Sequence, residues 1–484
     1  SQEILSKPIN FEENDELILE PKLKKYPQNQ EELKNEWKKF IKYNILQEIE
    51  TLNAKEETQR EKKDSVNRLK LKDTIKLEIL TPAQKQVKAT EEVKDLMTSM
   101  FKRFQKRKKM DWFSVYMNAY TEVFDPHTNY FSPQDKEDFD VSFKGKVIGI
   151  GATIQESKGK IKIGTLVVGA PAWKSKQISE GDEILKVQSK KGEEPINVTG
   201  MLVDEAVRFI RGEKGTEVVL TLKKKDGTIK EVKMIREEVA IEDTFARSII
   251  INGANGKKYG FINLPSFNAD FEDAKGRNAS DDIKAELIKL KAQNVEGIIL
   301  DLRNNGGGSL TEVVDIMGLF MNSGPVVQVK DGNGRVQVMR NKQNDPIWTG
   351  PLVIMQNELS ASASEILAGA MQDYGRAVIV GSPQSFGKGT VQTFVELNRF
   401  LNTSDDFGAL KLTIQKFYRV NGKSTQLKGV ESDIPMKDVF SYEEIGERFD
   451  NYALPWDQVN SSSFTVNNSI NVAELAKKSQ SRMA

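Results

Sequence analysis

The sequence has 484 residues, of which 38% are hydrophobic, and its 71 Lys and Arg nearly balance 70 Asp and Glu. Several domains are expected at this length, and the near-neutral charge argues against nucleic-acid binding. The sequence contains no run of 18 apolar residues, so it predicts no membrane-spanning helix. Without cysteine and with His127 as the one histidine, thiol catalysis, disulfides and a histidine or cysteine metal site are excluded, and we expect no metal or cofactor.

Residues 1–145 are charged and mostly helical in pattern. The polar start shows no signal-peptide pattern, so we expect that a signal sequence is absent or has been removed. A turn rich in Pro, Asp and Asn closes the region at 124–133, and we expect a structural role for His127 within it. Hydrophobic residues at helical spacing predict an amphipathic helix that packs on a core: Leu33, Trp37, Phe40, Ile41, Ile45 and Ile49.

Residues 146–237 predict short strands with one helix. The segment 147–154 is apolar with two glycines, 160–168 alternates, and Asp226-Gly227 between two strand patterns is a strong hairpin signal. The hydrophobic residues Leu202, Ala206, Phe209 and Ile210 form one helical face. We therefore predict a separate domain of about 90 residues.

Residues 238–440 alternate between apolar strand and helix patterns, which predicts an α/β layered core. Asn421-Gly422 adds a hairpin turn. Beyond 440 the pattern fades, and the polar stretch 461–468 predicts a tail segment that packs only partly. The expected strands are 259–264, 297–302, 352–355 and 377–380, and the expected helices are 281–293, 310–321 and 363–374.

The strongest candidate for chemistry is the segment 359–370, in which Ser362 lies between an apolar strand and an apolar-faced helix. Backbone N–H groups at a helix N-terminus stabilise negative charge, so a nucleophile placed there has an oxyanion donor beside it. The competing interpretation is a capping box formed by Ser362 and Glu365, which on this segment alone is favoured.

The second candidate is Lys388, which lies between two glycines in the segment 385–392. The segment departs from a phosphate-binding P-loop, because five residues separate Gly381 from Gly387 and Gly389 follows the lysine. Burial lowers the proton affinity of a lysine, which lets it act as the base for a serine. In isolation, a surface lysine in a glycine loop is the favoured alternative.

The third candidate is the segment 301–308, which follows a buried strand and ends in Gly306-Gly307-Gly308. Three glycines at a strand end offer free amides and room for a ligand backbone. In this order, 301–308, 360–365 and 386–392 resemble the C-terminal processing peptidases, peptidase family S41. The segments 124–130, 414–422 and 453–457 are similar to those of its long members.

The resemblance implies a serine endopeptidase with a Ser-Lys dyad. Two departures exist: the loop 381–388 is one residue longer than usual, and the sequence ends before the extended C-terminal domain of the longest relatives. The resemblance assigns Ser362 as the nucleophile and Lys388 as the base. It also implies that Gln392 orients the base, that the amides of Ala363 and Gly307 stabilise the oxyanion, and that Asp373 is a supporting acid.

The resemblance also implies a PDZ domain at 146–237. Such domains add a peptide strand to a sheet edge and hold its carboxylate in a nest of amides, for which the candidates are Gly149, Ile150, Gly151 and Ala152. The implied partners are protein substrates with free apolar C-termini, and an envelope adaptor protein. The implied location is the bacterial periplasm or cell envelope.

Together these expectations describe a multidomain α+β protein. A helical N-terminal domain (1–145) precedes an inserted PDZ domain (146–237), a layered crotonase-like or ClpP-like serine protease core (238–440) and a C-terminal tail segment (441–484). Two alternatives stay open. One is a non-catalytic PDZ scaffold on a protease-like core. The other is a crotonase-like acyl-transfer enzyme, which would share the layered core but not the three motifs.

Overall fold

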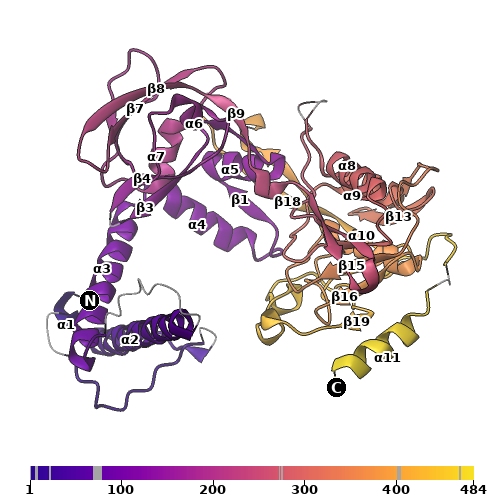
Figure 1. The fold of residues 1–484 in the computed structure, drawn as a ribbon, viewed down its shortest axis with the longest axis horizontal. Helices are drawn as coiled ribbons and strands as arrows, with labels where there is room; N and C mark the ends of the chain where they lie inside the picture. Colours follow the sequence, from indigo (N-terminus) through magenta and orange to yellow (C-terminus); the bar gives the residue numbers. More distant parts are fainter. Residues whose placement is uncertain are drawn as a thin grey trace. The chain divides into compact units, whose positions relative to one another are not determined.

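The computed structural model describes residues 2–5, 9–20, 23–68, 79–157, 159–271, 273, 276–400, 405–467 and 470–483. The chain forms two compact units, Ser1–Lys108 and Lys109–Ala484, and each is described by itself. Figure 1 shows the course of the chain through both units.

The first unit is helical. It contains α1 (Gln2–Leu5), α2 (Gln30–Arg68) and α3 (Pro82–Lys106), which begins at a capping box between Thr81 and Gln84. The predicted amphipathic helix is confirmed, since Ile41 and Ile45 of α2 are fully buried whereas Leu33 is exposed. They pack in a small core with three residues of α3: Ala89, Val93 and Met97.

The second unit opens with α4 (Lys109–Thr121), β1 (Asn129–Phe131) and α5 (Pro133–Lys144). Strand β1 pairs antiparallel with β18 (Ala409–Tyr418), far along the sequence. This pairing therefore places the turn before β1 next to strand β18.

A β-rich domain follows, in which a sheet runs in the order β3-β4-β5-β7-β8. Strand β3 lies at its edge beside α7, and β2 and β9 form a separate ribbon. The predicted hairpin at Asp226-Gly227 is confirmed by the antiparallel pairing of β7 and β8. The elements are β2 (Lys146–Gly149), β3 (Ala152–Ser157), β4 (Lys160–Leu166), α6 (Pro171–Ser175), β5 (Glu183–Gln188), β6 (Ile196–Asn197), α7 (Val203–Ile210), β7 (Glu217–Lys223), β8 (Ile229–Ile235) and β9 (Glu237–Ala240).

The layered core contains a six-stranded sheet in the order β10-β11-β12-β15-β16-β19, in which every pairing except that of β10 with β11 is parallel. All four predicted strands and all three predicted helices of this region are confirmed, with bounds shifted by a few residues. They are β10 (Arg247–Asn252), β11 (Lys258–Asn263), α8 (Ala279–Ala292), β12 (Gly297–Asp301), α9 (Leu310–Gly318), β15 (Leu352–Gln356), α10 (Ala363–Asp373), β16 (Val378–Gly381) and β19 (Ile434–Pro435).

A second sheet, ordered β1-β18-β13-β14 with β17 also paired to β18, supplies the other wall of the core. Its further strands are β13 (Gly324–Asp331), β14 (Val336–Asn341) and β17 (Thr390–Glu396). The predicted turn at Asn421-Gly422 is present, since the Gly422 amide donates to the Arg419 carbonyl. Short 3₁₀ turns lie at Glu242–Thr244, Ala254–Gly256, Leu397–Arg399, Val439–Tyr442 and Glu447–Phe449.

The end of the chain is largely exposed but tied to the core. The Trp456 indole donates to the Ser424 carbonyl, and the Asn467 amide donates to the Tyr374 carbonyl. Of the predicted polar stretch, 461–467 is described and Asn468 lies outside the described residues. The last helix is α11 (Val472–Met483).

Candidate active site

A pocket of about 720 Å³ brings together most of the predicted catalytic residues. The glycine turn after β12, the start of α10, and strands β17 and β18 line it, with α5 on one side. Ser362, Ala363, Lys388 and Gln392 all line this pocket with Gly307. Segments separated by about 80 residues of sequence therefore meet at one place.

Ser362 lies immediately before helix α10 in a strained backbone conformation, with φ 56° and ψ −110°. Such conformations cost free energy outside glycine and are concentrated at functional sites. The neighbouring Ser360 and Ser364 are buried, and their hydroxyls donate to the carbonyls of Leu302 and Asn305. Of the three serines, only Ser362 lines the pocket.

The glycine turn packs directly against this serine. Gly307 has φ +109°, and a Cβ added there would lie 2.8 Å from the Ser362 Cβ and 3.1 Å from the Ala363 nitrogen. The Ala363 amide occupies the first helical position, where no intrahelical acceptor exists. The Gly307 amide instead donates to Asn305 Oδ1 at 2.9 Å, so it reaches an oxyanion only after that bond is released.

We expect a Gly307→Val substitution to lower turnover by roughly 10²-fold or more, the scale of one lost oxyanion donor. The added side chain would meet both Ser362 and the Ala363 amide. The matched control is Gly306→Ala, because a Cβ at Gly306 has no atom within 4 Å. Turnover measured on an unfolded protein substrate tests this, and equal rates for both variants would refute a role of Gly307 in the chemistry.

Glu365 joins the serine to the lysine loop. Its fully buried carboxylate accepts the Ser362 amide at 2.8 Å, the Ser385 hydroxyl at 2.6 Å, and the amides of Gly387 and Lys388 at 2.7 and 3.0 Å. Burial raises the pKa of Glu365 to about 8, while these four donors lower it. Sequence reasoning treated Glu365 only as a capping residue, and nothing local in the sequence signals the contacts with 385–388.

Lys388 has the electrostatics expected of a base. Burial, together with the nearby positive charge of Lys411, lowers the pKa of Lys388 to about 8. The carboxylates of Glu447, Glu365 and Asp125 act in the opposite direction. A lysine in this environment is neutral in a substantial fraction of molecules near neutral pH, which a surface lysine is not.

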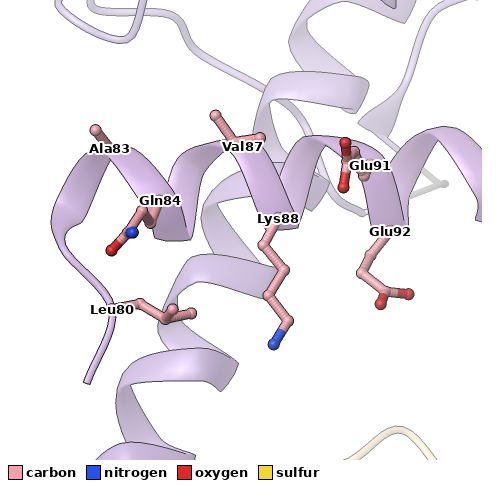
Figure 2. A pocket seen from close by; sticks show the side chains of 7 residues that line it. All are labelled: Leu80, Ala83, Gln84, Val87, Lys88, Glu91 and Glu92. Atoms are coloured by element: carbon pink, nitrogen blue, oxygen red, sulfur yellow. The ribbon is translucent and has the colours of Figure 1, made fainter. Parts of the chain in front are cut away.

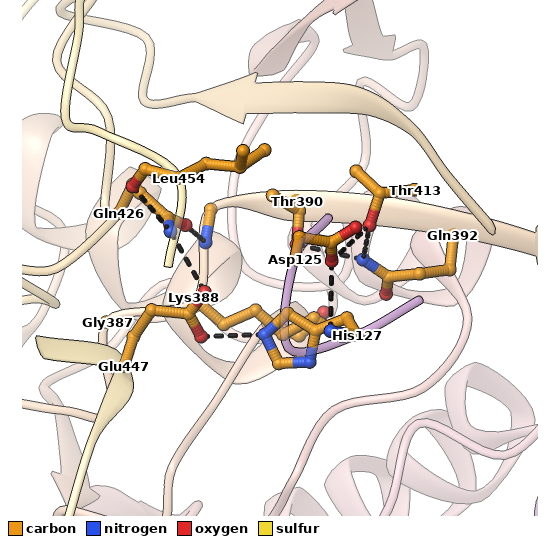
Figure 3. Close-up of polar contacts among 12 residues, drawn as sticks. Asp125, His127, Gly387, Lys388, Thr390, Gln392, Thr413, Gln426, Glu447 and Leu454 are labelled. Atoms are coloured by element: carbon orange, nitrogen blue, oxygen red, sulfur yellow. Dashed lines mark hydrogen bonds and ion pairs between the residues drawn. The ribbon is translucent and has the colours of Figure 1, made fainter. Parts of the chain in front are cut away.

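The two other predicted catalytic positions differ in location. Gln392 lies in the pocket, and its amide nitrogen donates to the hydroxyls of Thr390 and Thr413 at 2.8 and 3.1 Å (Figure 3). Asp373 lies at the last residue of α10, about 15 Å along the helix from Ser362. There it pairs with Arg419 and accepts the Asn421 amide at 2.8 Å, and burial raises its pKa although Arg419 opposes that shift.

The candidate carboxylate nest lies between β2 and the edge strand β3. Gly151 has φ +69°, and a Cβ there would lie 2.1 Å from the Ala170 Cβ, so only glycine fits. The Ile150 side chain is buried in the core of this domain, which leaves its backbone as the part available to a ligand. Gly149 has open space beside it, and Ala152 begins β3.

Figure 2 shows a pocket in the first unit, lined mainly by exposed residues of α3 with Leu80, and its charged side chains lie along a single helix face. Within the described ranges, no group of three or more acidic or histidine side chains could hold a metal ion. Over the same ranges, no helix combines the length and apolar character needed to cross a membrane.

Comparison with known families decides the identity of the core. A model described as peptidase family S41 matches residues 258–436. The chain belongs to peptidase family S41. Around this S41 core, a PDZ domain model matches 140–223, the tail specific protease N-terminal domain matches 1–134, and the C-terminal domain of tail specific protease matches 440–484. The family and the fold class inferred from the motifs are thereby confirmed.

Individual relatives agree with this S41 assignment. The chain is 39% identical to the tail-specific protease of Haemophilus influenzae over 86% of this chain and 57% of that protein. It is 31% identical to the carboxy-terminal processing protease CtpA of Bacillus subtilis over 64% of this chain and 60% of that protein. It therefore spans 57% and 60% of their lengths. A solved photosystem II D1 C-terminal processing protease is 24% identical, with a TM-score of 0.38, over 73% of this chain and 87% of that one.

Proposed function

We propose that this protein is a serine endopeptidase that captures the apolar C-termini of protein substrates and cuts them by a Ser-Lys mechanism. The observation that carries the proposal is the pocket in which strained Ser362 and partly buried Lys388 lie together with the glycine turn. The relatives named tail-specific protease and carboxy-terminal processing protease support the same reaction class.

In the proposed mechanism, Ser362 Oγ attacks the carbonyl carbon of the scissile peptide bond while the Lys388 amine takes the hydroxyl proton. The negative charge that develops on the carbonyl oxygen is stabilised by the amides of Ala363 and Gly307. Lys388 then gives its proton to the leaving amine. Water, deprotonated by the same lysine, hydrolyses the acyl-enzyme and restores the Ser362 hydroxyl. Gln392 orients the lysine, and Asp373 supports α10 through its pair with Arg419.

Substrate choice is assigned to the PDZ domain. Its edge strand β3 faces α7, which leaves an edge to which an extended peptide can add. The backbone from Gly149 to Ala152 lies at the start of that edge and would hold the terminal carboxylate. Periplasmic or envelope location, an envelope adaptor and the division of the chain at 145, 237 and 440 stay predictions.

The proposal is tested with two copies of one unfolded substrate, one ending in Ala-Ala and the other in Asp-Asp or an amide. We expect cleavage of the second to be about tenfold slower or more, because amidation removes a charged hydrogen-bond acceptor and aspartates are costly to bury. The control is the same Ala-to-Asp change in mid-chain, which should have little effect. Equal cleavage of both copies would mean that C-terminal capture does not select substrates.

A further inference from the structure

The turn that precedes β1 is hydrogen-bonded to strand β18, far along the sequence, and β18 contributes residues to the active-site pocket. Asp125 in this turn is buried, with 4% of its surface exposed. Its carboxylate accepts the His127 amide at 2.9 Å, the Thr128 hydroxyl, and the Thr413 hydroxyl at 2.8 Å (Figure 3). The last of these bonds joins the turn to strand β18, whose Thr413 also contacts Gln392.

We propose that Asp125 is a positioning residue of the active site, which acts through the Thr413 hydroxyl to fix the direction of the Gln392 side-chain amide. The inference rests on the proposed function, in which Gln392 orients Lys388. Asp125 lies outside residues 258–436, which match the S41 peptidase model, and inside residues 1–134, which match the tail specific protease N-terminal domain.

The direction of each hydrogen bond around Thr413 is fixed by Asp125. A carboxylate only accepts, so the single proton of the Thr413 hydroxyl is committed to Asp125. Thr413 Oγ1 can then only accept from Gln392, which places the amide nitrogen on this side. Thr390 alone does not decide the direction, because its hydroxyl can donate or accept.

With both N–H groups of Gln392 used by the two threonines, the amide oxygen is directed away from them. No hydrogen bond to that oxygen is found within the described part of the chain, and Gln392 lines the same pocket as Lys388. In the proposed arrangement this oxygen is free to accept from the Lys388 amine, whereas a flipped amide would present N–H groups to the lysine. Without Asp125, the Thr413 hydroxyl can donate to either partner, and the amide can flip.

The experiment measures kcat, KM and the thermal midpoint for Asp125→Ala, Thr413→Val, Gln392→Ala and the double variant Asp125→Ala/Gln392→Ala. We expect Asp125→Ala and Thr413→Val each to lower kcat about tenfold with KM little changed, the factor expected for one charge-linked hydrogen bond. Thr413→Ser should restore kcat. The double variant should be no slower than Gln392→Ala, because once the amide is gone the loss of Asp125 only removes a negative charge that raises the pKa of Lys388.

The matched control is Asp331→Ala, since Asp331 accepts the Asn333 and Arg335 amides in a turn outside the pocket. It should keep the wild-type kcat. Thr413→Val leaves the Asp125 turn intact and so tests the inference even where Asp125→Ala fails to fold. If Gln392→Ala were slow while Asp125→Ala and Thr413→Val kept the wild-type kcat, this inference alone would be overturned. The same holds if the losses of kcat in the two single variants multiplied in the double variant. Full-speed Gln392→Ala would overturn the assigned role of Gln392 as well.

Discussion

Replacing Ser362 with alanine is expected to lower peptide-bond hydrolysis by roughly 10⁴-fold or more, since the attacking oxygen and with it the covalent step are lost. The fold should persist, because Ser362 is only partly buried and its backbone amide bond to Glu365 does not need the side chain. The measurement is initial cleavage rate on an unfolded protein substrate, with thermal unfolding recorded in parallel.

The control for this prediction is Ser364→Ala, two residues along the same helix. Its hydroxyl donates to the Asn305 carbonyl, so the substitution should cost about 1 kcal/mol of stability and little activity. Activity that is lost in Ser364→Ala and kept in Ser362→Ala would contradict the choice of nucleophile. No hydrolysis by the wild-type chain would favour the alternative of a PDZ scaffold on an inactive core.

Lys388→Arg and Lys388→Ala are both expected to reduce turnover to near the level of Ser362→Ala. Arginine keeps the positive charge but does not release its proton at working pH, so it cannot act as a base. If Lys388→Arg retained more than a tenth of the activity, the residue would contribute charge rather than base catalysis. His127→Ala, measured beside them, should keep most of its activity when folded, because we expect a structural role for this residue.

The same lysine sets the pH dependence. The reactive form is the neutral amine, and burial with Lys411 nearby lowers the pKa of Lys388 to about 8. Below that pH the neutral fraction falls tenfold per unit, so kcat/KM should rise from pH 6 to 8 and level off above. A profile that falls as pH rises across this range would be inconsistent with a neutral lysine base.

Local sequence patterns predicted four of the six strands of the β10-β11-β12-β15-β16-β19 sheet and the three helices of the core. Strands such as β12 and β15 are short apolar runs buried on both faces, and the helices between them carry their own periodicity, so each element was visible without its neighbours. Strands β13 and β14 were not predicted. Strand β13 pairs with β18 across many residues of sequence, and β14 joins the sheet only through β13.

The motifs placed Ser362, Ala363, Lys388, Gln392 and Gly307 in one family pattern, and their meeting in one pocket follows from the ends of parallel strands lying at the same edge. Asp373 is a motif position that the fold puts at the other end of α10. From the sequence, Glu365 was interpreted only as a helix-capping residue. Its hydrogen bonds to the backbone of 385–388 form only in the folded chain.

The sequence by itself determined the family, the order of domains and the candidate nucleophile and base, because these depend on contiguous motifs. Tertiary structure decided which of three adjacent serines faces a cavity, how far burial lowers the pKa of Lys388, and how Asp125 reaches Thr413. These properties depend on desolvation and on hydrogen bonds between residues as many as 288 positions apart, which no local pattern encodes.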